Sequence, residues 1–156
     1  MPEIPAKLSS LLETLDLVTD RTERIQLLID IAERFRDVPP RIAERPFPEA
    51  ARVPACESEA YVWAEPRADG TLDFHFAVEN PQGISAKAMA VILGDRLSGA
   101  PLEQVAAVPQ DVVYRVFGRE LSMGKSMGLM GMVSMVNNLA KKALTPGPSP
   151  ASGRGV

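Results

Sequence analysis

The sequence predicts an α+β fold in which an antiparallel hairpin, with a possible third strand, packs against N- and C-terminal helices. Three observations predict it: apolar residues recur with helical spacing near both ends, period-two alternation is confined to residues 59–78, and proline or glycine separates the segments. Helices, then strands, then helices is the order of an α+β domain. The length of 156 residues fits one domain over residues 1–144, followed by a tail over 145–156.

The bulk composition is that of an ordinary globular protein, with 46% hydrophobic and 24% charged residues. A net charge of −3 and a pI near 5.2 argue against a nucleic-acid partner, which requires a clustered basic surface. No apolar stretch is long enough to span a membrane, and the N-terminus lacks a signal-peptide pattern. We therefore expect a cytoplasmic protein in a reducing environment.

Two helices open the chain. The first is predicted from leucines at helical spacing, namely Leu8, Leu11, Leu12 and Leu15. Asp20 and Glu23 have the spacing of a capping box that begins the second helix. Its apolar face is expected to contain Ile25, Leu28, Ile29, Ala32 and Phe35. Val38-Pro39-Pro40 should end this helix, because a proline disfavours helical geometry in the residue before it.

A stiff loop and a hairpin follow. Pro46, Pro48 and Pro54 punctuate residues 41–55, which show little periodicity. Glu59–Pro66 reads as one strand, Ala68-Asp69-Gly70 as a turn, and the following segment as the return strand. In that return strand alternate residues share the buried face, namely Leu72, Phe74, Phe76 and Val78. The other face is expected to present Asp73, His75 and Glu79.

The C-terminal half is predicted to be helical. Ser85 caps a helix to about Leu97, with Gly99 at its end, and Pro101 and Pro109 begin two short helices, the second ending at Gly118. The last helix runs from Ser122 to about Leu144 with an apolar stripe of Leu129, Met132, Val133, Val136, Leu139, Ala140 and Ala143. It holds five of the seven methionines, which we assign to core packing rather than to a binding face. Residues 145–156, rich in Pro and Gly, should be disordered.

Cys56 is the only cysteine. One thiol cannot form a disulfide framework or a cysteine-based cluster site within the chain, so we expect no metal and no cofactor. A lone cysteine is most often a small buried hydrophobe. Its setting in a Pro-bounded loop among Arg52, Glu57, Ser58 and Glu59 instead favours a partly exposed, reactive thiol.

Other candidate sites are weaker. His75 could act as a base for Cys56, but its place on the polar side of a strand fits a surface residue equally well. Ser58 lacks the Gly-x-Ser-x-Gly setting of a hydrolase nucleophile. Gly124 and Gly128 have the spacing of a membrane packing motif, but the charge on Lys125 excludes that setting. Phosphate loops and dinucleotide fingerprints are absent.

The Cys56 loop and its surroundings resemble the SufE family, and the resemblance covers residues 8–143. It is carried by two N-terminal helices ending at a proline, the loop Val53-Pro54-Ala55-Cys56-Glu57-Ser58, the strand with Trp63, the hairpin, and a last helix containing Lys125-Ser126-Met127-Gly128-Leu129. The family usually has glycine where this chain has Ala55, and arginine where it has Lys125. The resemblance implies a SufE/IscU-like fold.

The resemblance also implies a function. Cys56 would take sulfur as a persulfide from a PLP-dependent cysteine desulfurase, SufS-like or CsdA-like, activate that enzyme, and relay the sulfur to an iron–sulfur scaffold complex. Lys125, Arg52 and Ser58 would modulate the thiol or face the partner, and we expect the carboxylates of Glu57 and Glu59 to disfavour the thiolate until docking. One alternative is an adaptor in which Cys56 only packs. A cluster scaffold of the IscU type ranks last, because a scaffold needs several cysteines.

Overall fold

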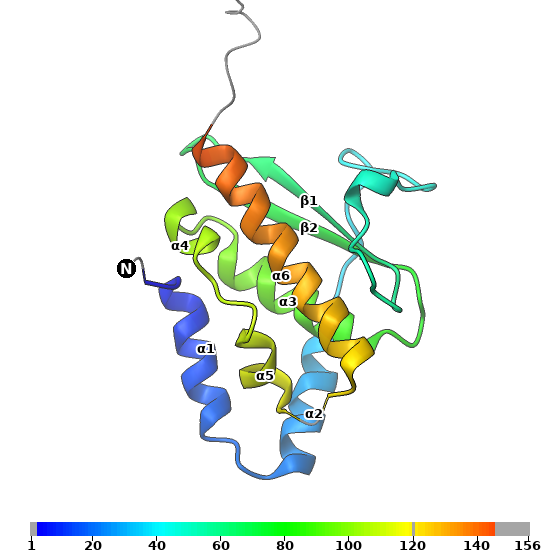
Figure 1. The fold of residues 1–156 in the computed structure, drawn as a ribbon, viewed down its shortest axis with the longest axis vertical. Helices are drawn as coiled ribbons and strands as arrows, with labels where there is room; N and C mark the ends of the chain where they lie inside the picture. The colour runs from blue at the N-terminus through cyan, green and yellow to red at the C-terminus, as the bar shows by residue number, and fades with distance from the viewer. Residues whose placement is uncertain (1–2, 120, 146–156) are drawn as a thin grey trace, which may run out of the picture.

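The computed structural model describes residues 3–119 and 121–145, and Figure 1 shows their arrangement. The predicted α+β class is confirmed. In chain order the elements are α1 (Ala6–Asp16), α2 (Arg21–Ala32), a 3-10 turn η1 (Glu49–Ala51), β1 (Ala60–Pro66), β2 (Leu72–Val78), α3 (Ile84–Leu97), α4 (Leu102–Ala106), α5 (Val112–Phe117) and α6 (Met123–Leu144).

The hairpin formed by β1 and β2 is the centre of the fold. The strands pair antiparallel, from Ala60 opposite Val78 to Pro66 opposite Leu72. The predicted return-strand residues Leu72, Phe74, Phe76 and Val78 are all buried. No third strand forms among the described residues. The outer edge of β2 is met by single hydrogen bonds instead, including one of 2.8 Å from the Val38 amide to the Phe76 carbonyl.

Helices cover one face of this hairpin. α3 packs against β2 and α6 against β1, while α2 packs on α3 and α4 on α6. Figure 1 shows α1 and α5 on the side of α3 and α6 that faces away from the hairpin. The core lies between these layers and is dominated by fully buried leucine, methionine and valine side chains from α1, α3 and α6, among them Leu8, Leu12, Met89, Leu93, Met132 and Val133.

The second helix differs from the prediction in two respects. It begins as predicted, with the Asp20 side chain accepting a hydrogen bond from the Glu23 amide at 3.0 Å. It ends at Ala32, well before Val38, and Ile25 is 48% exposed rather than part of the apolar face. The side chain of Arg24 lies across that end of the molecule and donates to carbonyls of Leu15, Val18, Arg115 and Val116. Leu28 and Ala32 on the same face are buried, so the apolar face of α2 is covered only toward its C-terminal end.

The C-terminal helices follow the prediction closely, with small corrections. Gly83, not Ser85, precedes α3, and Ser85 lies inside its first turn. Ala143 is exposed and therefore does not belong to the apolar stripe of α6. Met132 is fully buried as predicted, but Met123 and Met127 are 77% and 52% exposed, so their assignment to the core is wrong. The predicted disordered tail begins at Thr145, and its residues 146–156 lie outside the described part of the chain.

Candidate functional site

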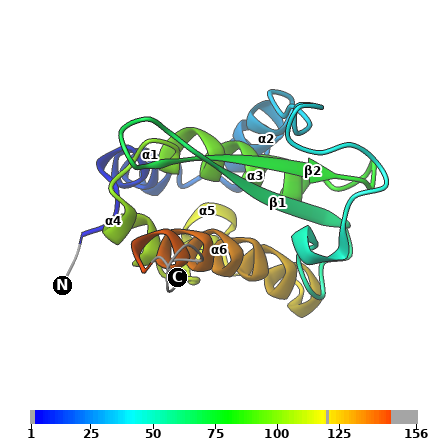
Figure 2. The same ribbon diagram turned by 90° about the horizontal axis from the view of Figure 1, so that it is seen from above.

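Cys56 lies in the segment that connects η1 to β1, at the edge of a cavity of about 160 Å³. Its side chain is only 8% exposed, so the expectation of a partly exposed thiol is wrong for this conformation. The cavity wall combines three parts of the chain: the Cys56 segment, the start of α3 and the start of α6. Figure 2 shows the segment before β1 and the start of α6 at the same end of the molecule.

A row of glycines on α6 allows the Cys56 segment to approach the helix closely. A Cβ atom added to Gly128 would lie 3.1 Å from Cys56 Cα and 3.3 Å from its Sγ. One added to Gly124 would lie 3.2 Å from a Glu57 carboxylate oxygen, and one added to Gly131 would lie 2.9 Å from a Val53 methyl carbon. The spacing that resembles a membrane packing motif thus serves a contact between this helix and a loop.

Two helix starts border the cavity. Ile84, Ser85 and Ala86 of α3 line it, as do Gly124 and Lys125 of α6. The start of α6 is capped by the Ser122 hydroxyl, which accepts from the Lys125 amide at 3.3 Å, whereas no side chain caps α3. The first amides of a helix and its dipole favour negative charge. The Cys56 side chain itself lies against Gly128, in the second turn of α6.

The structure brings four of the six predicted site residues together. Cys56, Glu57, Ser58 and Lys125 all line the cavity. Arg52 does not line it: its amide binds the Glu49 carbonyl, its side chain lies 3.9 Å from the Glu49 carboxylate, and it forms an isolated bridge with Tyr61. The sixth predicted residue, Glu59, is exposed and also lies outside the cavity lining.

Left-handed backbone flanks the cysteine on both sides. Ala55 has a φ of 58° and Glu59 a φ of 53°, and these are the positive-φ residues other than glycine in the described chain. The Glu59 amide donates to the Cys56 carbonyl at 3.1 Å, which closes a tight turn around the thiol. Left-handed geometry costs a residue with a Cβ atom about 1–2 kcal/mol, so this turn is held under strain.

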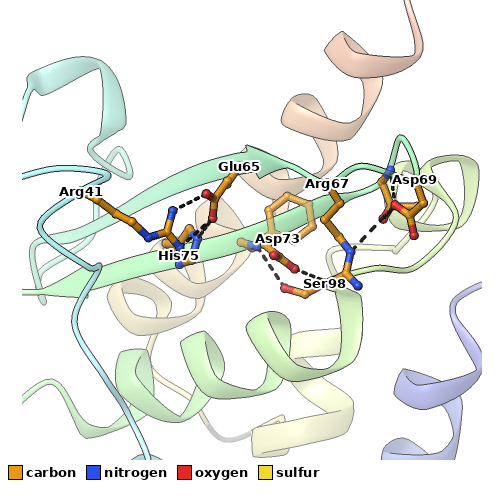
Figure 3. A network of polar contacts seen from close by, with 9 residues as sticks. Arg41, Glu65, Arg67, Asp69, Asp73, His75 and Ser98 are labelled. Atoms are coloured by element: carbon orange, nitrogen blue, oxygen red, sulfur yellow. Dashed lines mark hydrogen bonds and ion pairs between the residues drawn. The ribbon is translucent and has the colours of Figure 1, made fainter.

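His75 belongs to a different part of the surface and does not act on Cys56. It lies on the outer face of the hairpin, as predicted, where its Nε2 is 3.0 Å from a Glu65 carboxylate oxygen (Figure 3). Arg41 binds the same carboxylate. Hydrogen bonds from Arg41 and then from His75 lower the pKa of Glu65 to about 2. This network fastens the loop after α2 to the hairpin.

The lining residues outside the prediction include Gly83 and Ile84. A Cβ atom on Gly83 would lie 2.9 Å from the Ser58 side chain, so the start of α3 also packs closely against the Cys56 segment. The available signal was the Pro81-Gln82-Gly83 sequence directly before an apolar helix, which predicted a turn but gave no sign of the long-range contact. No pattern within either segment predicts the contact between residues 58 and 83.

Other kinds of site are absent from the described ranges. No group of three or more His, Cys, Asp or Glu side chains that could hold a metal ion occurs in residues 3–119 and 121–145. None of the helices that the structure describes has the length and hydropathy needed to cross a bilayer.

Comparisons with known proteins bear on the family and the fold. The family model described as "SufE: Fe-S metabolism associated domain" matches residues 9–140. No significant match was found among curated protein sequences. A solved structure, described as the solution structure of a hypothetical protein from Thermus thermophilus, aligns with a TM-score of 0.70 and 28% identity over 91% of this chain and 98% of that one. Because the family match spans most of the sequence, the chain belongs to the SufE family of proteins associated with Fe–S metabolism.

Proposed function

We propose that this protein accepts sulfur from a PLP-dependent cysteine desulfurase, stimulates that enzyme, and relays the sulfur to an iron–sulfur scaffold. The observation that carries the proposal is the placement of the only thiol, Cys56, in a cavity between the starts of α3 and α6. Family membership supports a role in Fe–S metabolism, and the thiol supplies the chemistry that sulfur relay requires. A free thiol of this kind remains usable in a reducing compartment such as the cytoplasm.

The transfer step is a thiol–disulfide type of exchange. The Cys56 thiolate attacks the outer sulfur of a persulfide on the donor enzyme, and a new S–S bond forms on Cys56. The S–S bond of the donor breaks, and its cysteine leaves as a thiolate. The sulfur atom moves with no net oxidation or reduction. The cavity of about 160 Å³ offers space beside the thiol for one more sulfur.

Burial of the thiol adds a requirement for movement. With 8% of the residue exposed, Cys56 offers little surface to a sulfur atom that is attached to another protein. We infer that the turn between Ala55 and Glu59 opens during transfer. Left-handed geometry at both of these residues reduces the free energy that opening requires, because an open turn releases the strain. We infer that the desulfurase favours the open form when it docks.

Intact-protein mass spectrometry tests the proposal. The protein is incubated with a cysteine desulfurase, its PLP and L-cysteine, and we expect a gain of about 32 Da, the mass of one sulfur atom, on the peptide that contains Cys56. Cys56→Ser should gain no mass and should no longer raise the turnover of the desulfurase. Absence of the adduct from the wild-type protein under turnover conditions would contradict the proposal.

One observation favours a second candidate function. A cysteine that is 8% exposed and contacts a helix glycine is also what a purely packing residue looks like. In that case the protein is an adaptor that docks a desulfurase or another partner without carrying sulfur. The same substitution separates the two functions, because an adaptor with Cys56→Ser would still stimulate the enzyme.

A further inference from the structure

A second cavity, of about 720 Å³, lies beside the outer edge of β2. Its walls come from residues 33–39 after α2, from the middle of β2 and from the later part of α3. Within the described part of the chain it shares no lining residue with the Cys56 cavity. Its volume falls in the range of about 300–1,000 Å³ that is typical of ligand sites. The proposed sulfur relay does not use this cavity.

The register of the hairpin determines which backbone groups of β2 face the cavity. In an antiparallel pair, alternate residues direct both their N–H and their C=O toward the neighbouring strand. The Glu79 amide donates to the Glu59 carbonyl at 3.1 Å, so the odd-numbered residues of β2 bond to β1. The even-numbered residues therefore direct their backbone groups to the outer edge. The Val38 amide reaches the Phe76 carbonyl from that side, which agrees with this assignment.

Two backbone groups on this edge have no partner. The Phe74 amide donates to the Ser98 hydroxyl at 3.0 Å (Figure 3), and the Phe76 carbonyl accepts from the Val38 amide at 2.8 Å. Between them lie the Phe74 carbonyl and the Phe76 amide, and neither forms a hydrogen bond with any residue that the structure describes. Both phenylalanines line the cavity and are 5% and 4% exposed. Buried backbone groups are almost always paired, so this acceptor and this donor are available to a molecule in the cavity.

The free pair is complementary to the main chain of one extended residue. In a parallel pair of strands, a single residue donates its N–H to one carbonyl of the neighbouring strand and accepts through its C=O from the amide two residues later. One residue of a peptide therefore satisfies the Phe74 carbonyl and the Phe76 amide together. Ser98 and Val38 occupy the next positions on the edge in the two directions. The complementary ligand is therefore a short peptide segment that forms its main-chain bonds through one residue.

The cavity also offers one unpaired charge of each sign. The Arg36 guanidinium and the Glu33 carboxylate belong to its lining, and neither forms an ion pair within residues 3–119 and 121–145. A peptide with an acidic and a basic side chain is therefore electrostatically complementary to it. The other titratable side chains of the lining already have partners, namely Arg34 with Asp95, Asp37 with Arg45 and His75 with Glu65.

We propose that the cavity beside β2 binds a short extended peptide segment of a partner protein, which runs parallel to β2 and bonds to the Phe74 carbonyl and the Phe76 amide. This binding function goes beyond sulfur relay. The main-chain bonds supply affinity for any sequence, and Arg36 and Glu33 favour peptides with charges of both signs. Because the two cavities have separate linings, a peptide held here does not occupy the Cys56 cavity.

Amide NMR spectra of the full chain, labelled with nitrogen-15, test the proposal. The probe is the peptide acetyl-Glu-Val-Lys-amide, and its control is the same peptide N-methylated at all three residues. Gly94→Leu blocks the cavity, because a Cβ atom on Gly94 would lie 3.7 Å from the Phe74 carbonyl oxygen and a longer side chain occupies the space beside it. Gly94→Ala is the matched variant that leaves this space open.

We expect the Phe76 amide resonance to shift saturably with the probe, at a Kd of about 1 mM or lower. The N-methylated peptide should bind about tenfold more weakly or worse, because it lacks the donor for the Phe74 carbonyl. Gly94→Leu should weaken binding of the probe by a similar factor, and Gly94→Ala should bind it within about twofold of the wild type.

Three results would overturn the proposal: no saturable shift of the Phe76 amide, equal binding of the two peptides, or shifts confined to the lining of the Cys56 cavity. If Gly94→Leu does not fold, the comparison of the two peptides on the wild-type protein still decides, because main-chain recognition requires the N–H groups that methylation removes.

Discussion

Replacing Ala55 by glycine should stabilise the closed turn around Cys56. Ala55 has a φ of 58°, where a Cβ atom costs about 1–2 kcal/mol and glycine has no such cost. Glycine also gives the unfolded chain more freedom, which opposes folding by about 0.5–1 kcal/mol. The balance predicts that Ala55→Gly raises the free energy of unfolding by up to about 1 kcal/mol. The resemblance to the SufE family points the same way, since the family usually has glycine here.

Thiol reactivity should change in the opposite direction. Opening of the turn releases the strain at Ala55, so the strain lowers the free energy of opening. Glycine is not strained at this φ, so the free energy of opening should be higher in Ala55→Gly. A difference of up to about 1 kcal/mol corresponds to roughly a fivefold smaller open population. Alkylation of Cys56, followed by mass spectrometry, should therefore slow by about two- to fivefold in Ala55→Gly. This decrease requires that the reagent reacts only with the open turn, as 8% exposure of the thiol suggests.

Ala50→Gly is the matched control for this experiment. Ala50 lies in η1, near Ala55 in sequence, is exposed, and does not have positive φ. Here glycine brings only the entropic cost, so the free energy of unfolding should fall by about 0.5–1 kcal/mol. Urea denaturation at constant pH measures both variants. The reasoning is refuted if Ala55→Gly destabilises the protein as much as Ala50→Gly does.

Three further predictions concern the same structure. Gly128→Ala should destabilise the protein by about 1–3 kcal/mol in urea denaturation, because its Cβ atom would lie 3.1 Å from Cys56 Cα. Gly94→Ala, whose nearest contact is at 3.6 Å, should be neutral or stabilising instead. Glu57→Gln should speed Cys56 alkylation, because Glu57 lines the cavity and its carboxylate is expected to disfavour the thiolate. Glu59→Gln should not speed it, because Glu59 lies outside the cavity lining. Equal alkylation rates in the two variants would exclude this effect of Glu57. Glu65 stabilises the fold fully above its ordinary pKa of 4.5 and loses this contribution as the pH falls toward about 2. Denaturation of Glu65→Gln between pH 5 and 2 should therefore show a weaker pH dependence than the wild type, and an identical dependence would contradict the assignment.

Local signals in the sequence predicted most of the fold. The alternation of Leu72, Phe74 and Phe76 defined the buried face of β2, and Asp20 with Glu23 defined the start of α2. The errors arose where a distant residue decides the outcome. Ile25 fits the same helical stripe as the buried Leu28 and Ala32, yet it is 48% exposed, because coverage of a stripe residue depends on which distant element packs against it. Helix periodicity contains no information about such a contact.

Most residues of the candidate site were predictable from the sequence, but their geometry was not. The single cysteine and its neighbours Glu57 and Ser58 were identified from the sequence and do share a cavity with Lys125. Burial of the thiol was not predictable, because it depends on a contact between residues 56 and 128 that no local pattern encodes. The polar neighbours of Cys56 suggested exposure, yet the absence of a side chain at Gly128 allows the thiol to lie against the helix.

The glycines of α6 and the strained turn act on the same equilibrium in opposite directions. Contact with Gly128 holds the Cys56 segment against the helix, where the thiol is protected from solvent and from oxidants. Positive φ at Ala55 and Glu59 weakens that closed state. Under the proposed function, a closed state that is too stable would prevent sulfur transfer, and one that is too weak would expose the proposed persulfide between transfers. Ala55→Gly removes strain from the closed state, whereas Gly128→Ala weakens the contact that holds the segment against the helix. Ala55→Gly should therefore slow Cys56 alkylation, and Gly128→Ala should speed it. If both substitutions slow alkylation, the thiol is not controlled by this balance.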